Sequence, residues 1–155
     1  MTKRHIPEGL GEVTAALSVP DCNRALEFYS KVFGATEILR LRDPDGSTAH
    51  LEIRIGSSVV MLADENPDWG NLSPETIGGT PVRLHLYVED VDACAERAVA
   101  AGAELSMPVA DQFYGDRSGR ILDPFGHIWI LATHIEEVSQ EEMQRRYDEM
   151  TSQGD

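Results

Sequence analysis

The pattern of apolar and polar positions along the chain occurs twice. From Val13, an alternating stretch is followed by an aspartate, by apolar residues three and four positions apart, and by a glycine. The segment from Val82 repeats this order, with Val19-Pro20-Asp21 aligned on Val88-Glu89-Asp90. Alternation is typical of a strand, and three-to-four spacing is typical of an amphipathic helix. Each copy therefore predicts a strand followed by a helix.

The ends of the two predicted helices carry suitable chemistry. Asp21 and Asp90 stand where a side-chain oxygen can accept hydrogen bonds from free amides of the first turn. Gly34 and Gly102 stand where glycine can take the left-handed conformation that ends a helix. Each half is predicted as a βαβββ module, with later strands over 36–42, 49–55 and 58–63, and over 104–109, 117–122 and 127–133.

Turn and loop residues divide the chain. The first module is predicted over residues 13–64 and the second over residues 82–134, joined by a linker over 65–81 that is rich in Pro, Gly, Asn and Asp. Ser139 and Glu142 have the spacing of a capping box, which predicts a C-terminal helix over 139–150. We expect a single domain over 1–155, of class α+β.

Composition and charge exclude several classes of function. The hydrophobic fraction of 41% and the charged fraction of 26% are those of a globular chain. No apolar run approaches the roughly 20 residues that cross a membrane, and none follows the first basic residues as in a signal peptide. A net charge of −14 opposes binding to nucleic acid and anionic lipid. We expect a cytoplasmic protein in which Cys22 and Cys94 are reduced.

Duplicated modules with a DPxGH turn before the last strand, here Asp123 to His127, resemble the glyoxalase/bleomycin resistance/dioxygenase superfamily, also called vicinal oxygen chelate. The resemblance covers about residues 13–133 and is greatest to bacterial PhnB-like proteins. It is carried by the stretches AHLEIRIGSSVVMLADE, GGTPVRLHLYVEDVDA and DQFYGDRSGRILDPFGHIWILATHIEEVS. It implies curved mixed sheets around a concave pocket, helices outside, a homodimer and a small organic ligand.

The resemblance also implies where a metal would bind. In metal-dependent members the ligands project from the first and fourth strands of each module, and these positions fall near Thr14, Met61, Arg83 and Ile130. Methionine, isoleucine and a cationic arginine do not suit a divalent ion that needs carboxylate oxygen or imidazole nitrogen. No metal is therefore expected there. A set of His50, Glu52 and His85 remains as an alternative metal site.

Polar residues alternate with apolar ones along two predicted strands. Arg83, His85 and Tyr87 share one face in RLHLYV, and His50 and Glu52 do so in HLEIRI. A solvated sheet face shows the same alternation, but convergent polar groups on an apolar surface are also typical of small-molecule sites. The expected ligand-binding residues are Arg83, Tyr87, His50, Met61, Thr14, Ile130, Tyr114 and Arg117.

Two main functions follow. The first is a metal-independent binder of a small organic molecule, in which Arg83 pairs with an anionic or carbonyl group and Met61 and Ile130 form apolar walls. The alternative is a glyoxalase-type enzyme, an isomerase, lyase or dioxygenase, in which His85 and Glu52 are the acid–base groups and Arg83 stabilises negative charge. A third, structural or protein-binding role predicts a cup filled by its own side chains.

Overall fold

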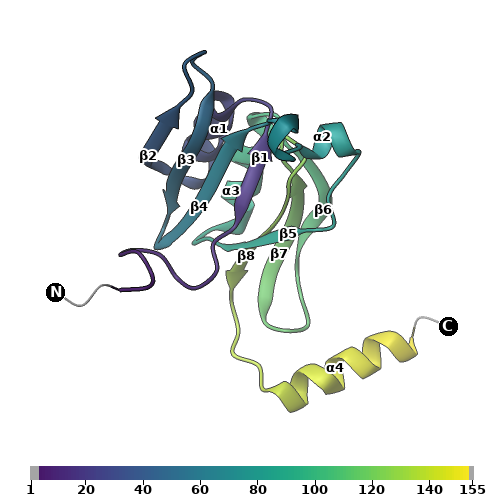
Figure 1. Cartoon of the computed structure of the whole chain (residues 1–155). Coiled ribbons are helices and arrows are strands. Elements are labelled where there is room, and N and C mark those ends of the chain that lie inside the picture. The colour runs from purple at the N-terminus through teal and green to yellow at the C-terminus, as the bar shows by residue number, and fades with distance from the viewer. Residues whose placement is uncertain (1–3, 154–155) are drawn as a thin grey trace. The chain divides into compact units, whose positions relative to one another are not determined.

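The structure is a computed structural model that describes residues 4–153 in two compact units. The first unit ends at Pro81 and the second begins at Val82. Each unit contains a four-stranded mixed sheet with one helix packed on it (Figure 1). The predicted class, α+β with two βαβββ modules and a C-terminal helix, is confirmed. No helix among residues 4–153 is long and apolar enough to cross a membrane.

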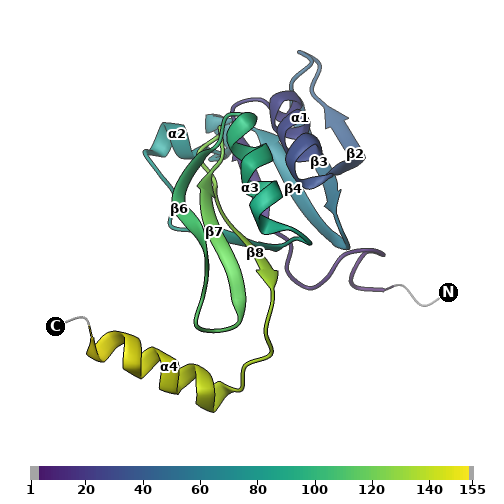
Figure 2. The ribbon, with the colours of Figure 1, turned by 180° about the vertical axis from the view of Figure 1, so that it is seen from behind.

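The first unit forms a sheet in the strand order β1-β4-β3-β2, with β1 parallel to β4 and the other pairs antiparallel. Its elements are β1 (Ala16–Val19), α1 (Cys22–Phe33), β2 (Thr36–Arg42), β3 (Thr48–Ile55) and β4 (Ser58–Asp64). Helix α1 contacts β2, β3 and β4, and Figure 2 shows it across one face of this sheet. Tyr29 of α1 and Leu51 and Ile53 of β3 are fully buried between helix and sheet.

The second unit repeats this arrangement in the order β5-β8-β7-β6, with β5 parallel to β8. Its elements are β5 (Arg83–Tyr87), α3 (Val91–Ala100), β6 (Glu104–Asp111), β7 (Asp116–Leu122) and β8 (Ile128–His134). Helix α3 covers one face of β6, β7 and β8 (Figure 2). The predicted linker of the first unit contains two short helices, η1 (Pro67–Trp69) and α2 (Pro74–Ile77).

The helix caps agree with the sequence. Asp21 accepts a hydrogen bond from the amide of Asn23 at 2.8 Å, and Asp90 accepts one from the amide of Ala93 at 3.1 Å. Gly34 ends α1 with a φ of 70°, in the left-handed region that glycine tolerates. Helix α3 ends one residue earlier than predicted, so its cap is Ala101 and Gly102 follows it.

The two cysteines are buried thiols that form no disulfide with one another, one in each unit. Burial raises the pKa of both Cys22 and Cys94. A buried thiol that stays protonated is a poor nucleophile, so both residues act as small core side chains.

Strand bounds differ from the predictions in places that matter for the site. Strand β1 begins at Ala16, so Thr14 lies in the loop before it. Strand β7 begins at Asp116, one residue before the predicted strand over 117–122, and β6 continues to Asp111, beyond the predicted strand over 104–109. These extensions arise because cross-strand pairing adds residues that local pattern does not mark as strand.

A bulge shapes edge strand β6. Met107 pairs with Arg120, and Ala110 pairs with Ser118, so two residues of β6 lie opposite the single residue Gly119. A Cβ atom at Gly119 would lie 2.9 Å from Cγ2 of Val109 and 3.1 Å from the carbonyl oxygen of Met107. Glycine at this position therefore lets the bulged strand approach β7 closely.

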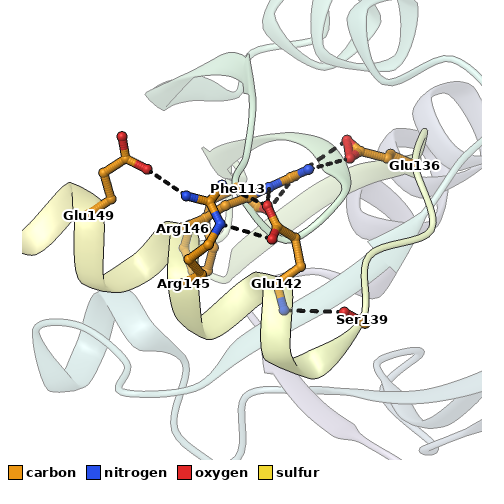
Figure 3. Close-up of polar contacts among 7 residues, drawn as sticks. All are labelled: Phe113, Glu136, Ser139, Glu142, Arg145, Arg146 and Glu149. Atoms are coloured by element: carbon orange, nitrogen blue, oxygen red, sulfur yellow. Dashed lines mark hydrogen bonds and ion pairs between the residues drawn. The ribbon is translucent and has the colours of Figure 1, made fainter.

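Helix α4 (Gln140–Ser152) follows the second sheet and is held by polar contacts (Figure 3). Arg146 donates to the carbonyl oxygen of Phe113 at 3.1 Å and pairs with Glu136 at 2.7 Å. The ring centroids of Phe113 and Tyr147 are 5.6 Å apart. The helix is thereby attached to the loop between β6 and β7.

The serine half of the predicted capping box is observed at the start of α4, since Ser139 Oγ accepts a hydrogen bond from the amide of Glu142 at 3.2 Å. The Glu142 side chain turns to Arg145 and Arg146, and hydrogen bonds from these two guanidinium groups lower its pKa to about 2 (Figure 3). Arg145 also pairs with Glu149 at 3.0 Å.

Candidate functional site

The face of the second sheet that lies opposite α3 carries a group of polar side chains. On β5, Arg83, His85 and Tyr87 are exposed, as the alternating pattern predicts. Their neighbours Leu84 and Leu86 alternate onto the other face, where Trp129 and Leu131 of β8 are buried. The outward face of β5 is therefore polar, and the inward face belongs to the core.

One row of this face runs across all four strands. His85 pairs in register with Ile130, Ile130 with Arg120, and Arg120 with Met107. Residues directly opposite one another in paired strands project to the same side of a sheet. The row therefore combines an imidazole, a guanidinium and two apolar side chains on one surface.

A cavity of about 110 Å³ lies at the β6–β7–β8 part of this face. Its lining residues are Met107, Pro108, Gln112, Tyr114, Ser118, Gly119, Arg120 and Ile130. The hydroxyls of Tyr114 and Ser118 are 3.4 Å apart. A cavity of roughly 150 Å³ accepts benzene, so this one has room for part of a small organic molecule.

Arg120 is the charged residue of this cavity. Its Nε is buried and has no hydrogen-bond partner among residues 4–153. Arg120 was not among the predicted site residues, although its position next to the fully buried Ile121 places it on the outward face by simple alternation. The residue predicted on this third strand of the module was Arg117, which lies on the opposite face.

A hydrogen-bonded group lies at the neighbouring end of β7. The buried carboxylate of Asp116 accepts from the hydroxyl of Tyr87 at 2.8 Å and contacts Nδ1 of His134 at 2.9 Å. This hydrogen bond to Asp116 raises the pKa of Tyr87, which keeps the phenol protonated. Ala132 of β8 is the register partner of Tyr87, and the Tyr87 side chain reaches across this strand to Asp116 on β7.

His134 is held from both ring nitrogens. Asp116 contacts Nδ1, and Glu137 contacts Nε2 at 3.1 Å. Hydrogen bonds first to Asp116 and then to Glu137 raise the pKa of His134. The predicted strands over 117–122 and 127–133 left Asp116 and His134 just outside their ends, because the contact between these residues spans 18 positions and depends on the β7–β8 register.

The raised pKa of His134 predicts a pH dependence of stability. The protonated imidazole stabilises the fold below about pH 6.5, the pKa of an unfolded histidine. This contribution is lost as the pH rises through the raised pKa of His134 in the folded state. We expect the wild type to lose more of its free energy of unfolding between about pH 6 and 8 than a His134→Gln variant. Urea unfolding at a series of pH values measures both slopes, and equal slopes would contradict the assigned contacts.

The other predicted residues of the second unit lie in two environments. Tyr114 and Ile130 line the cavity. Arg117 projects to the α3 side, where it pairs with Asp92 at 2.8 Å and with Asp111 at 3.0 Å. These carboxylates raise the pKa of Arg117 and hold its guanidinium away from the outward face.

The predicted residues of the first unit lie on its own sheet. Nε2 of His50 and Oε2 of Glu52 are 2.8 Å apart on β3, so the predicted shared face is observed. Met61 of β4 is the register partner of Glu52. His85, the third member of the alternative metal set, belongs to the second unit.

The residues at the implied metal positions do not fit a divalent cation. Thr14, Met61, Arg83 and Ile130 offer neither imidazole nor carboxylate. Within residues 4–153, no group of three or more His, Cys, Asp or Glu side chains is arranged to hold a metal ion. The outward face of the second sheet offers arginine, tyrosine, histidine and amide groups, and the carboxylate of Asp116 is engaged by Tyr87 and His134.

Known proteins share both sequence and fold with the chain. The model of the Glyoxalase/Bleomycin resistance protein/Dioxygenase superfamily matches residues 10–131. The uncharacterized protein Rv0887c of Mycobacterium tuberculosis is 44% identical over 142 residues, which are 90% of this chain and 82% of that relative.

Two solved structures show the same fold. A PhnB protein from Bacillus cereus has a TM-score of 0.62 at 18% identity and covers 79% of this chain and 99% of its own. The fosfomycin resistance protein FosX of Listeria monocytogenes, solved with Mn(II) and sulfate, has a TM-score of 0.62 at 22% identity. That alignment covers 88% of this chain and 97% of FosX. At these identities the likeness concerns the fold alone.

Proposed function

Because this chain belongs to the glyoxalase/bleomycin resistance protein/dioxygenase superfamily, we propose that it binds a small organic molecule without a divalent metal. The proposed site is the outward face of the second sheet. The observation that carries the proposal is the cavity of about 110 Å³, which combines apolar walls with an arginine whose Nε has no partner. Small-molecule sites typically have this composition.

The site residues have separate roles in this proposal. Met107 and Ile130 contact the apolar part of the ligand, and Tyr114 offers a hydroxyl. His85 and Arg83 extend the polar surface along β5. Tyr87, already bonded to Asp116, orients the edge of the site.

A fragment screen by ligand-observed NMR tests this function. We expect fragments that bind the wild type and lose about fivefold in affinity with His85→Ala, as for one lost hydrogen bond. His50→Ala is the matched control on the first sheet and is expected to leave the affinity unchanged. A folded protein that binds no fragment, or binding that depends on His50 alone, would refute the proposal.

The alternative function is a glyoxalase-type enzyme of unassigned substrate, with His85 and Glu52 as acid–base groups. Of these two residues, Glu52 is bonded to the imidazole of His50 at 2.8 Å, and a bonded imidazole–carboxylate pair is a common acid–base arrangement. Metal analysis of untagged protein purified without chelator separates the two functions. Near-stoichiometric zinc, nickel, iron or manganese would favour the enzyme and contradict the metal-free binder.

We propose that the protein acts as a cytoplasmic homodimer. Support comes from apolar side chains exposed on the edge strands, Leu39 and Leu41 of β2 and Leu105 and Met107 of β6. Exposed apolar side chains of this kind are typical of association surfaces. Light scattering coupled to gel filtration is expected to give twice the chain mass of 17.1 kDa. A mass of 17.1 kDa would contradict the dimer.

A further inference from the structure

The arginines of the second unit differ in what they contact. Arg117, Arg145 and Arg146 form ion pairs with carboxylates. Arg83 and Arg120 lie on the outward face of the sheet, and neither has an ion pair among the described residues. Two cations thus share one sheet face in a chain that has 27 acidic and 13 basic residues.

Arg120 is the more informative of the two. Its Nε is removed from water and has no acceptor, an arrangement that costs free energy unless a partner is present at some stage. The face does carry acidic residues, but the buried carboxylate of Asp116 is engaged by Tyr87 and His134. Glu104 is the register partner of Leu122, one row beyond Arg120. The protein therefore leaves the guanidinium of Arg120 available inside the cavity.

We infer that the cavity binds the carboxylate of a small organic acid, with Arg120 as its anion-binding residue. This inference rests on the proposed binding function and names its ligand class. The planar fork of a guanidinium matches a carboxylate in two parallel hydrogen bonds, which a lysine cannot reproduce.

The surroundings of Arg120 fit the remainder of such a ligand. Hydroxyl groups of Tyr114 and Ser118 and the amide of Gln112 add donors near the carboxylate. Met107 and Ile130 provide apolar walls on either side of Arg120 in the same row. Because about 110 Å³ is less than a benzene-sized cavity needs, the body of the acid extends from the cavity over the sheet face.

The test compares acids with their neutral amides. Three matched probe pairs are used: benzoate and benzamide, phenylacetate and phenylacetamide, and butanoate and butanamide. Affinities are measured by protein-observed NMR titration. The wild type is expected to prefer each acid by about tenfold or more, the effect of a charge-assisted hydrogen bond. Equal affinity for acids and amides would overturn the inference.

Substitutions identify which arginine causes the preference for acids over amides. In Arg120→Gln the acid preference is expected to vanish while amide affinity stays within about twofold. Arg120→Lys is expected to keep only part of the preference, because it retains the charge without the fork. Arg83→Gln, at the other arginine of this face, is expected to keep most of it. A preference that survives Arg120→Gln but is lost in Arg83→Gln would assign the anion to Arg83 instead.

Stability gives a second readout that does not depend on the probes. A half-buried guanidinium whose buried Nε has no partner opposes folding, so Arg120→Met is expected to raise the urea midpoint of unfolding. A lowered midpoint would mean that Arg120 is a structural residue and would overturn the inference. If neutral fragments bind but the protein does not prefer the acids over their amides, the inference is wrong and the proposed binding function still stands.

Discussion

Replacing Asp123 with alanine is expected to lower the free energy of unfolding by about 3–5 kcal/mol. Asp123 is 3% exposed and occupies the turn between β7 and β8. Its Oδ1 accepts from the amides of Phe125 and His127, both at 2.9 Å, and its Oδ2 accepts from Nε1 of Trp129 at 2.9 Å. Alanine would leave three donors without their acceptor, one of them on a buried tryptophan.

The first unit supplies a matched control for Asp123. Asp43 has the same place in its turn, since its amide donates to the carbonyl of Ser47 as that of Asp123 does to His127. The Asp43 carboxylate accepts from Ser47 Oγ at 3.3 Å, a long contact near solvent. Asp43→Ala is therefore expected to cost below about 1 kcal/mol. Equal losses in the two variants, measured by urea unfolding, would contradict the account of the β7–β8 turn.

Substituting alanine for Gly115 is expected to cost about 3 kcal/mol and to displace the loop that lines the cavity. Gly115 has a φ of 101°, and a Cβ atom there would lie 2.2 Å from the carbonyl oxygen of Glu136. The carbonyl of Gly115 also accepts from the amides of Ile135 and Glu136, so the two backbones are held together. Neither can move aside without losing these hydrogen bonds.

A Gly46→Ala variant separates backbone strain from steric clash, the two causes of the stability loss expected for Gly115→Ala. Gly46 has a φ of 91°, but open space surrounds the position of its missing Cβ atom. Gly46→Ala therefore carries the backbone strain alone and is expected to cost about 1–2 kcal/mol. Thermal unfolding and fragment affinity are measured for both variants. A Gly115→Ala protein that matches Gly46→Ala in stability and binds fragments normally would show that Gly115 does not position the cavity loop.

Local patterns predicted much of the fold. The two modules, the caps at Asp21 and Asp90 and the outward face of β5 follow from alternation, helical spacing and turn chemistry. These features depend on residues within a few positions of one another. Strand ends were less accurate, because β7 gains Asp116 from its pairing with β8.

The candidate site was predicted only in part, for a physical reason. Arg83, His85 and Tyr87 were found because one strand shows their shared face. The Asp116–His134 contact and the Arg117–Asp92 pair join residues 18 and 25 positions apart, and no local pattern indicates them. Arg120 alternates with a buried isoleucine and was within reach of sequence reasoning. That its Nε is buried without a partner depends on the packing of neighbouring strands, which no local pattern indicates.

The location of the ligand is decided by an amide chemical-shift map of ¹⁵N-labelled protein during titration with the tightest-binding fragment. Binding on the outward face of the second sheet predicts that the largest shifts fall within residues 107–120 and 128–134, where the cavity-lining residues and their strand partners lie. Shifts confined to residues 16–64 would place the ligand elsewhere and contradict the proposed site. The site would also be contradicted if substitutions of Arg120 and His85 left the shifts unchanged.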